Sequence, residues 1–158
     1  MPLTFNIRHL ENKDLHLEGD LPTEELELEL QDDMIRPGDA LEYDLEVQRI
    51  EGAALVQGRL ALPVEYTCVR CLRKFSRGLE LPDWTVHLPL TGEDAVKVDN
   101  DLVNLTPYLR EDILLALPQH PLCEAECSGL KVPARTKDPG RTKNASAWDE
   151  LDKLKLKE

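Results

Sequence analysis

Apolar and polar residues alternate in short segments along the first half of the chain. Leucines and glutamates alternate over residues 25–30, and a similar alternation covers residues 41–48 and 59–66. A period of two predicts strands that bury one face. The dipeptide Glu51-Gly52 lies between the second and third segments, and glycine tolerates the backbone conformation of a tight turn. The pattern therefore predicts an antiparallel hairpin over residues 41–66.

Two prolines mark irregularities in the predicted strands. Pro63 lies inside the segment 59–66, and because proline has no backbone N–H, that side of the strand should face a sheet edge or a bulge. A further strand is predicted for residues 79–90, where the apolar phase shifts at Pro82-Asp83. We expect a bulge or a break in the strand at this dipeptide.

A helix is predicted for residues 106–117. Thr106 suits the N-cap, and Pro107 suits the first helical position because that position needs no N–H. Pro118 should end the helix, since proline cannot continue it. Apolar residues spaced by four line one helical face, namely Leu109, Ile113 and Leu117.

These elements predict an α+β fold. The core would be a mostly antiparallel β-sheet, which could close into a barrel, with one packed helix. A length of 158 residues suits one domain and a tail, and we expect the domain to cover residues 1–130. Residues 131–158 should form a flexible basic linker followed by a short C-terminal helix. The linker is expected because few apolar residues occur before Ser146, where the helix should begin.

The charge of the chain is unevenly distributed. Its net charge is −12, and between Glu11 and Glu51 alone there are 15 acidic and three basic residues. The rest of the chain is neutral, with 16 of each sign. The net charge argues against simple electrostatic attraction of nucleic acid to the whole surface. An acidic segment of this kind could instead meet a basic protein.

A short basic stretch accompanies the first pair of cysteines. Between positions 68 and 77 there is no acidic residue, and the stretch holds four basic ones, Arg70, Arg73, Lys74 and Arg77. A second basic stretch covers residues 131–143. Such stretches could contact phosphate groups, although ordinary solvated surface explains both of them, and the acidic segment, equally well.

All four cysteines occur in two close pairs. Cys68 and Cys71 form a CxxC motif, and Cys123 and Cys127 form a CxxxC motif. Zinc favours four thiolates at the corners of a tetrahedron, and each close pair can supply two of them from one turn. Nearby Arg70, Arg73 and Lys74 would lower the pKa values of the thiols. Four plain thiols and a redox-active pair remain alternatives, and His120 could replace one ligand.

The sequence shows no sign of an enzyme or of a membrane protein. It has no phosphate-binding loop, dinucleotide fingerprint or HExxH motif. A zinc ion held by four thiolates would leave no open position for a substrate. The first ten residues lack a basic region followed by an apolar run, and no apolar stretch reaches about 20 residues. We therefore expect a cytoplasmic protein with reduced cysteines, without membrane contact or a small-molecule substrate.

Four segments, in the same order, resemble those of one known family. The first is Tyr66–Leu72, followed by Phe75. The second, residues 101–118, is a predicted helix preceded by an acidic residue and ended by a proline. The third, residues 121–130, is a cysteine pair followed by Gly-Leu, and the fourth, residues 147–155, is a short segment rich in leucine and lysine. Together they resemble the YceD family of large ribosomal RNA subunit accumulation proteins. The resemblance covers about residues 40–158.

The resemblance implies a non-enzymatic ribosome-biogenesis factor that supports accumulation of large-subunit rRNA. Such a factor would contact rRNA through Arg70, Arg73, Lys74 and Arg77, or a basic ribosomal protein through the acidic segment, or both. Many relatives carry further cysteines after Gly-Leu, but residues 131–135 here have none. Any zinc must therefore bind Cys68, Cys71, Cys123 and Cys127.

Two alternatives belong to other functional classes. The chain could be a zinc-stabilised interaction module without RNA contact that uses a sheet edge or the C-terminal helix. It could also be a thiol-redox protein. A thioredoxin-like role would require the CxxC motif to open a helix, whereas here strand-like sequence lies on both sides of it.

Overall fold

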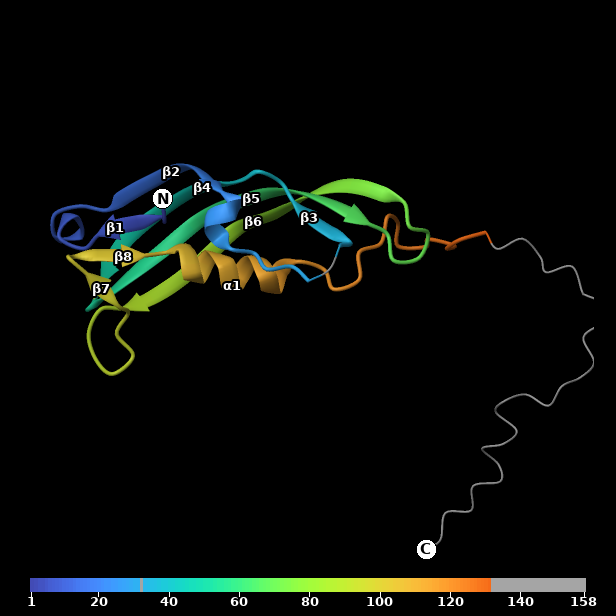
Figure 1. The fold of residues 1–158 in the computed structure, drawn as a ribbon. Helices are drawn as coiled ribbons and strands as arrows, with labels where there is room; N and C mark the ends of the chain where they lie inside the picture. The colour runs from blue at the N-terminus through green and yellow to red at the C-terminus, as the bar shows by residue number, and fades with distance from the viewer. Residues whose placement is uncertain (32, 132–158) are drawn as a thin grey trace, which may run out of the picture.

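The computed structural model describes residues 1–31 and 33–131. The predicted C-terminal helix and nearly all of the predicted linker lie outside these residues. The described chain is mostly antiparallel sheet with one α-helix, as the sequence predicts (Figure 1). Its strands are β1 Thr4–Asn6, β2 Leu15–Pro22, β3 Ile35–Pro37, β4 Ala40–Ile50, β5 Ala53–Thr67, β6 Lys74–Pro89, β7 Val98–Asp99 and β8 Leu102–Asn104. Its helices are the short 3₁₀ segments His9–Glu11 and Thr23–Leu26 and the α-helix α1 Thr106–Ala116.

The larger sheet is built around β5. One edge of β5 pairs with β6 from Ala53 to Thr67, so β4 and β3 share its other edge one after the other. β2 pairs with the far edge of β4. Within the described residues β2 and β6 do not pair with each other, so the sheet is open and not a barrel. A small sheet of order β1-β8-β7 lies at the end opposite the β5–β6 turn (Figure 1).

The predicted hairpin is formed by β4 and β5. Ile50 pairs with Ala53 across a two-residue turn. The turn residues Glu51 and Gly52 have φ angles of +36° and +85°. Positive φ at both positions defines the type I′ turn, whose twist matches that of the adjoining strands.

Pro63 faces a bulge, as expected. Four residues, 38–41, stand opposite residues 62–63 where the partner of β5 changes from β3 to β4. The N–H of Gly38 donates to the carbonyl of Pro63 at 2.7 Å. In an antiparallel strand the nitrogen and the carbonyl of one residue point to the same side. The nitrogen of Pro63 therefore lies at this irregularity, where no ladder hydrogen bond is lost.

The predicted irregularity in the fourth strand is a bulge between β5 and β6. Pro82 and Asp83 of β6 together stand opposite Arg59 of β5. The extra residue restores the inward direction of the apolar side chains on the far side of the bulge, so that Trp84 is buried.

The strand predicted for residues 25–30 is wrong. This segment instead contains the end of the second 3₁₀ helix, followed by Glu27 with φ +45° and a stretch without regular structure. Leu26 is completely buried, and Leu28 and Leu30 pack partly against the core. The alternation therefore reflects the burial of the leucines and not a strand. Because β2 already occupies the free edge of β4, the segment pairs with no strand among the described residues.

The α-helix packs on the inner face of the sheet, and Pro118 follows its end as predicted. Leu109 and Ile113 are completely buried. The indole N–H of Trp84 donates to a carboxylate oxygen of Asp112 at 2.6 Å and ties β6 to the helix. The N-cap predicted at Thr106 is wrong, since Leu105 is the N-cap and the Thr106 hydroxyl instead accepts the N–H of Leu3 at 3.0 Å.

Gly58 of β5 leaves no room for a side chain beside β4. An added Cβ would stand 2.1 Å from the carbonyl oxygen of Asp44. Gly58→Ala should therefore lower the free energy of unfolding by about 1–3 kcal/mol or more, because the clash is with backbone. Urea unfolding measures this change. Gly78→Ala is the control, since its Cβ would meet no atom within 4 Å, and equal losses for both variants would contradict the packing described.

Candidate metal centre and charged surfaces

The first cysteine pair lies in the tight turn between β5 and β6. Residues 68–73 connect the two strands, and we call this segment the knuckle. The N–H of Cys68 donates to the carbonyl of Arg73 at 2.8 Å, and that of Leu72 donates to the carbonyl of Cys68 at 2.9 Å. Leu72 adopts a left-handed conformation with φ +61°. The turn places the side chains of Cys68 and Cys71 on the same side.

The second cysteine pair is carried to the knuckle by the segment that follows α1. The N–H of Val69 donates to the carbonyl of Pro121 at 3.0 Å. The guanidinium of Arg70 donates to the carbonyl of Cys127 at 3.2 Å. These two hydrogen bonds hold residues 121–127 against the knuckle, although the two pairs are far apart in sequence.

The four sulfur atoms form one compact cluster. All lie within 4.8 Å of one another, with 3.6 Å between Cys71 and Cys123 and 3.8 Å between Cys68 and Cys127. All four cysteines are free, and Cys68 is completely buried. Sulfurs around a tetrahedral zinc ion at 2.3 Å stand about 3.8 Å apart. The cluster therefore has about the size of a four-thiolate metal site, and His120 is not part of it.

The backbone around the cluster favours a thiolate at Cys68. Burial alone would raise its pKa, but the backbone N–H groups of Cys123, Cys71 and Arg70 lower the pKa to about 6. Burial and the three neighbouring thiols raise the pKa of Cys123 to about 12. From the sequence, the basic side chains were expected to lower the pKa values of the thiols. In the structure, backbone N–H groups lower the pKa of Cys68. N–H groups directed at sulfur stabilise negative charge there.

The four basic residues lie in the knuckle and at the start of β6. Arg70, Arg73, Lys74 and Arg77 are all exposed. Lys74 lies 4.0 Å from Glu65, and the guanidinium of Arg77 lies 5.3 Å from the ring centroid of Phe75. Lys74 and Arg77 are three residues apart on a strand, so they project from opposite faces of the sheet.

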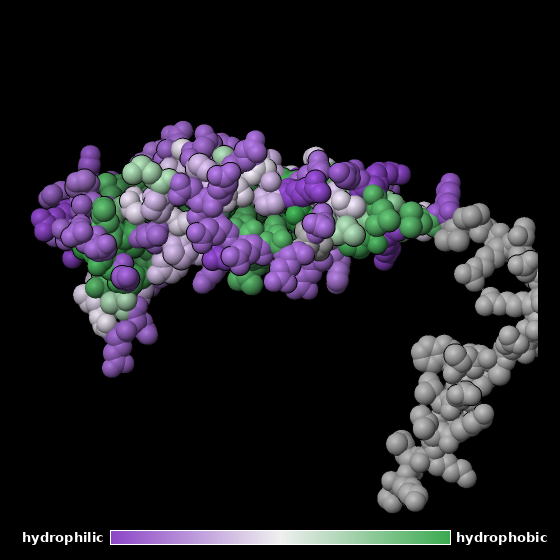
Figure 2. Space-filling view, viewed as in Figure 1, coloured by the Kyte–Doolittle hydropathy of each residue, from purple (hydrophilic) through white to green (hydrophobic). Residues whose placement is uncertain are grey.

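The turn also exposes apolar side chains. Leu72 is 52% exposed and Val69 is 38% exposed. Figure 2 shows apolar surface beside hydrophilic side chains at the end of the molecule where the described chain ends. The metal cluster thus lies beneath a mixed basic and apolar tip.

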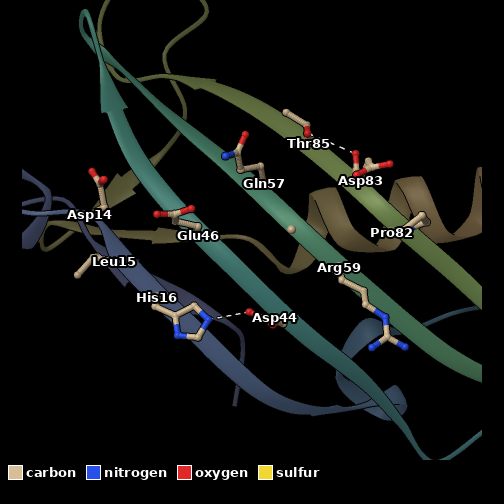
Figure 3. A pocket seen from close by; sticks show the side chains of 11 residues that line it. Asp14, Leu15, His16, Asp44, Glu46, Gln57, Arg59, Pro82, Asp83 and Thr85 are labelled. Atoms are coloured by element: carbon tan, nitrogen blue, oxygen red, sulfur yellow. Dashed lines mark hydrogen bonds and ion pairs between the residues drawn. The ribbon is translucent and has the colours of Figure 1, made fainter.

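The outer face of the sheet is acidic. Glu42, Asp44 and Glu46 of β4 are exposed on the face opposite α1, and Figure 3 shows two of them in an open pocket with Asp83. His16 on β2 lies 2.6 Å from a carboxylate oxygen of Asp44. This hydrogen bond raises the pKa of His16 above its ordinary value. This pair was not predicted from the sequence, although the alternation of residues 15–21 is typical of a strand.

No helix in the described part of the chain is long and apolar enough to cross a membrane.

Comparisons with known proteins place the chain in a family. A family model described as "Large ribosomal RNA subunit accumulation protein YceD" matches residues 56–155. Uncharacterized proteins of Mycobacterium bovis and Mycobacterium tuberculosis are 26% identical over 104 residues, which is 61% of this chain and 50% of theirs. The chain thus spans about half the length of these curated relatives, and no solved structure matches it. Since the family model covers more than half of the chain, including both cysteine pairs, the chain belongs to the YceD family.

Proposed function

We propose that the chain is a cytoplasmic, non-enzymatic ribosome-biogenesis factor that supports accumulation of large-subunit rRNA by binding that RNA. The family description supports the role in rRNA accumulation. The observation that carries the contact is the placement of Arg70, Arg73, Lys74 and Arg77 around one tightly bonded turn, although the chain has a net charge of −12. Basic side chains held in place bind phosphates with a smaller loss of conformational entropy than mobile ones.

We propose further that the cysteine cluster holds one structural Zn²⁺. Four thiolates are a typical closed zinc site, and backbone N–H groups directed at sulfur are suited to thiolate ligands. The ion would join the knuckle covalently to residues 121–127. Its role would be to fix the basic residues in space, because a site with four protein ligands leaves no position for a substrate.

Protein purified without chelator should contain about one zinc ion per chain. Its four thiols should resist alkylation until the protein is denatured. Cys68→Ser should weaken zinc binding more than about 100-fold, because even changes outside the ligands cost 10–100-fold. Elemental analysis and thiol counting measure both effects. His120→Ala should retain the metal, and a metal-free protein with four freely reactive thiols would contradict the site.

The RNA contact predicts a strong dependence on salt. Arg70→Glu, Arg73→Glu and Lys74→Glu together should weaken binding of a large-subunit rRNA fragment at least about tenfold. The slope of log affinity against log salt should become less steep by about 2–3. The reason is that each phosphate contact that is lost reduces the number of counterions released on binding by about one. Fluorescence anisotropy over a salt series measures both quantities.

A matched variant separates the knuckle from net charge. Reversal of three exposed bases elsewhere, Lys13, Arg59 and Lys97, changes the net charge equally and should change binding much less. If the two triple variants weaken binding equally, or if neither weakens it, the chain does not contact RNA through the knuckle. The second outcome would favour an interaction module without RNA contact.

The acidic outer face supports a second contact, with a basic ribosomal protein. Three carboxylates of β4, those of Glu42, Asp44 and Glu46, are exposed on one face, and Asp83 lies in the same open pocket as two of them. Arg59 and His16 line the same pocket, but carboxylates outnumber them there. An excess of one sign of charge attracts a partner of opposite charge and raises the rate of association. The acidic face and the knuckle could serve two partners at once.

Neutralising the acidic face with Glu42→Gln, Asp44→Asn and Glu46→Gln should weaken binding of a basic ribosomal protein roughly tenfold at low salt. The loss should shrink as salt rises, because salt screens exposed charges. Calorimetry at two salt concentrations tests this. Glu93→Gln, Asp94→Asn and Glu111→Gln are the control, since they remove the same charge from exposed sites elsewhere. Equal losses in both variants would exclude a specific acidic face.

A further inference from the structure

A pocket lies next to the knuckle, between the start of β6 and the segment that follows α1. Its volume is about 470 Å³, and residues of both segments line it. Ligand pockets in proteins commonly have volumes of about 300–1,000 Å³. We call it the Tyr66 pocket, and the lining residues that matter most are Tyr66, Phe75, Arg77, His120 and Leu122.

Tyr66 contributes an unpaired polar group to this pocket. The residue is only 3% exposed, and its ring stacks on Phe75 with 5.3 Å between centroids and 28° between planes. Its hydroxyl has no hydrogen-bond partner among the described residues. The hydroxyl is not one of the buried polar atoms that lack a partner, so it is accessible from the pocket and free to form a hydrogen bond with a ligand.

The charge of this pocket differs from that of the rest of the surface. None of its lining residues is acidic, whereas the open pocket on the outer face contains Asp44, Glu46 and Asp83. Arg77 gives it a positive charge. In a chain with a net charge of −12, this pocket is suited to an anionic ligand.

The walls of the pocket suit a flat ring. The guanidinium of Arg77 is planar and covers the ring of Phe75 at 5.3 Å from its centroid, so its outer face is the flat surface, and Leu79, Pro121 and Leu122 are apolar. Proteins bind unpaired bases by stacking them on aromatic rings and on arginine, and by hydrogen bonds to their edges. A paired base presents neither its face nor its Watson–Crick edge to such a pocket.

We propose that the Tyr66 pocket binds one unpaired nucleotide of an RNA strand. The base lies against the guanidinium of Arg77 and the apolar wall, with an edge atom bonded to the Tyr66 hydroxyl, and the adjoining phosphates run toward Arg70 and Arg73. This proposal rests on the proposed contact with RNA and adds to it a preference for single-stranded segments. Phosphate contacts alone give no such preference.

The test compares single-stranded and double-stranded RNA with the full chain. The probes are an oligouridylate of about 12 nucleotides, within the range of known single-strand sites, and an RNA duplex of the same length. Tyr66→Phe removes only the hydroxyl and should weaken binding of the single strand roughly three- to tenfold, with duplex binding unchanged. Arg77→Lys keeps the charge, loses the planar surface, and should act in the same selective way.

Tyr108→Phe is the matched control, because it removes the hydroxyl of a half-buried tyrosine on α1, outside this pocket. It should bind both probes as the unsubstituted chain does. Circular dichroism checks that Tyr66→Phe folds, and the ring that packs on Phe75 is retained in that variant.

Two results would contradict the proposal that this pocket binds a nucleotide. One is unchanged single-strand binding by Tyr66→Phe and Arg77→Lys, and the other is equal loss for both probes. If the triple knuckle reversal still weakens binding, the proposed function stands without the pocket. If the chain binds neither probe and no large-subunit rRNA fragment, both proposals fail.

Discussion

The continuous pairing of β5 with β6 is the feature on which the rest of the structure depends. It runs from Ala53 opposite Pro89 to Thr67 opposite Lys74, with one bulge. Because β6 takes one edge of β5 along this whole length, β3 and β4 must share the other edge. The same ladder ends directly at Cys68. The position of the metal cluster is therefore fixed by strand register, and a slip of one residue would turn its first ligand to the other face.

Local chemistry explains why much of the fold could be predicted from the sequence. The hairpin at Glu51-Gly52, the bulges at Pro63 and Pro82, and the helix end at Pro118 each follow from one or two residues that restrict the backbone. The strand β2 shows alternation at residues 15–21, but its pairing with β4 and the pairing of β1 with β8 could not be predicted, because they depend on partners distant in sequence. The alternation at residues 25–30 predicted a strand wrongly, since burial alone produces the same pattern.

The candidate site was predictable to a similar degree. The close spacing within each cysteine pair indicates a shared turn, so all four ligand candidates could be named in advance. What joins the pairs is the hydrogen bond from Val69 to Pro121 together with the Arg70 contact to Cys127, and neither has a sequence signal. Tyr66 continues the alternation of a buried strand, so its unpaired hydroxyl becomes visible only when residues 118–125 are placed beside it.

The pairing of β1 with β8 also bears on how the chain folds during its synthesis. Strands β4, β5 and β6 are consecutive and can form a meander from local contacts, which generally form fast. Thr4 pairs with Asn104, so β1 is made early and must wait for about 100 further residues before its partner exists. Until then the buried side chain of Phe5 has no core to enter. β1 thus joins the fold only after the meander has been made, because its partner β8 comes later in the chain.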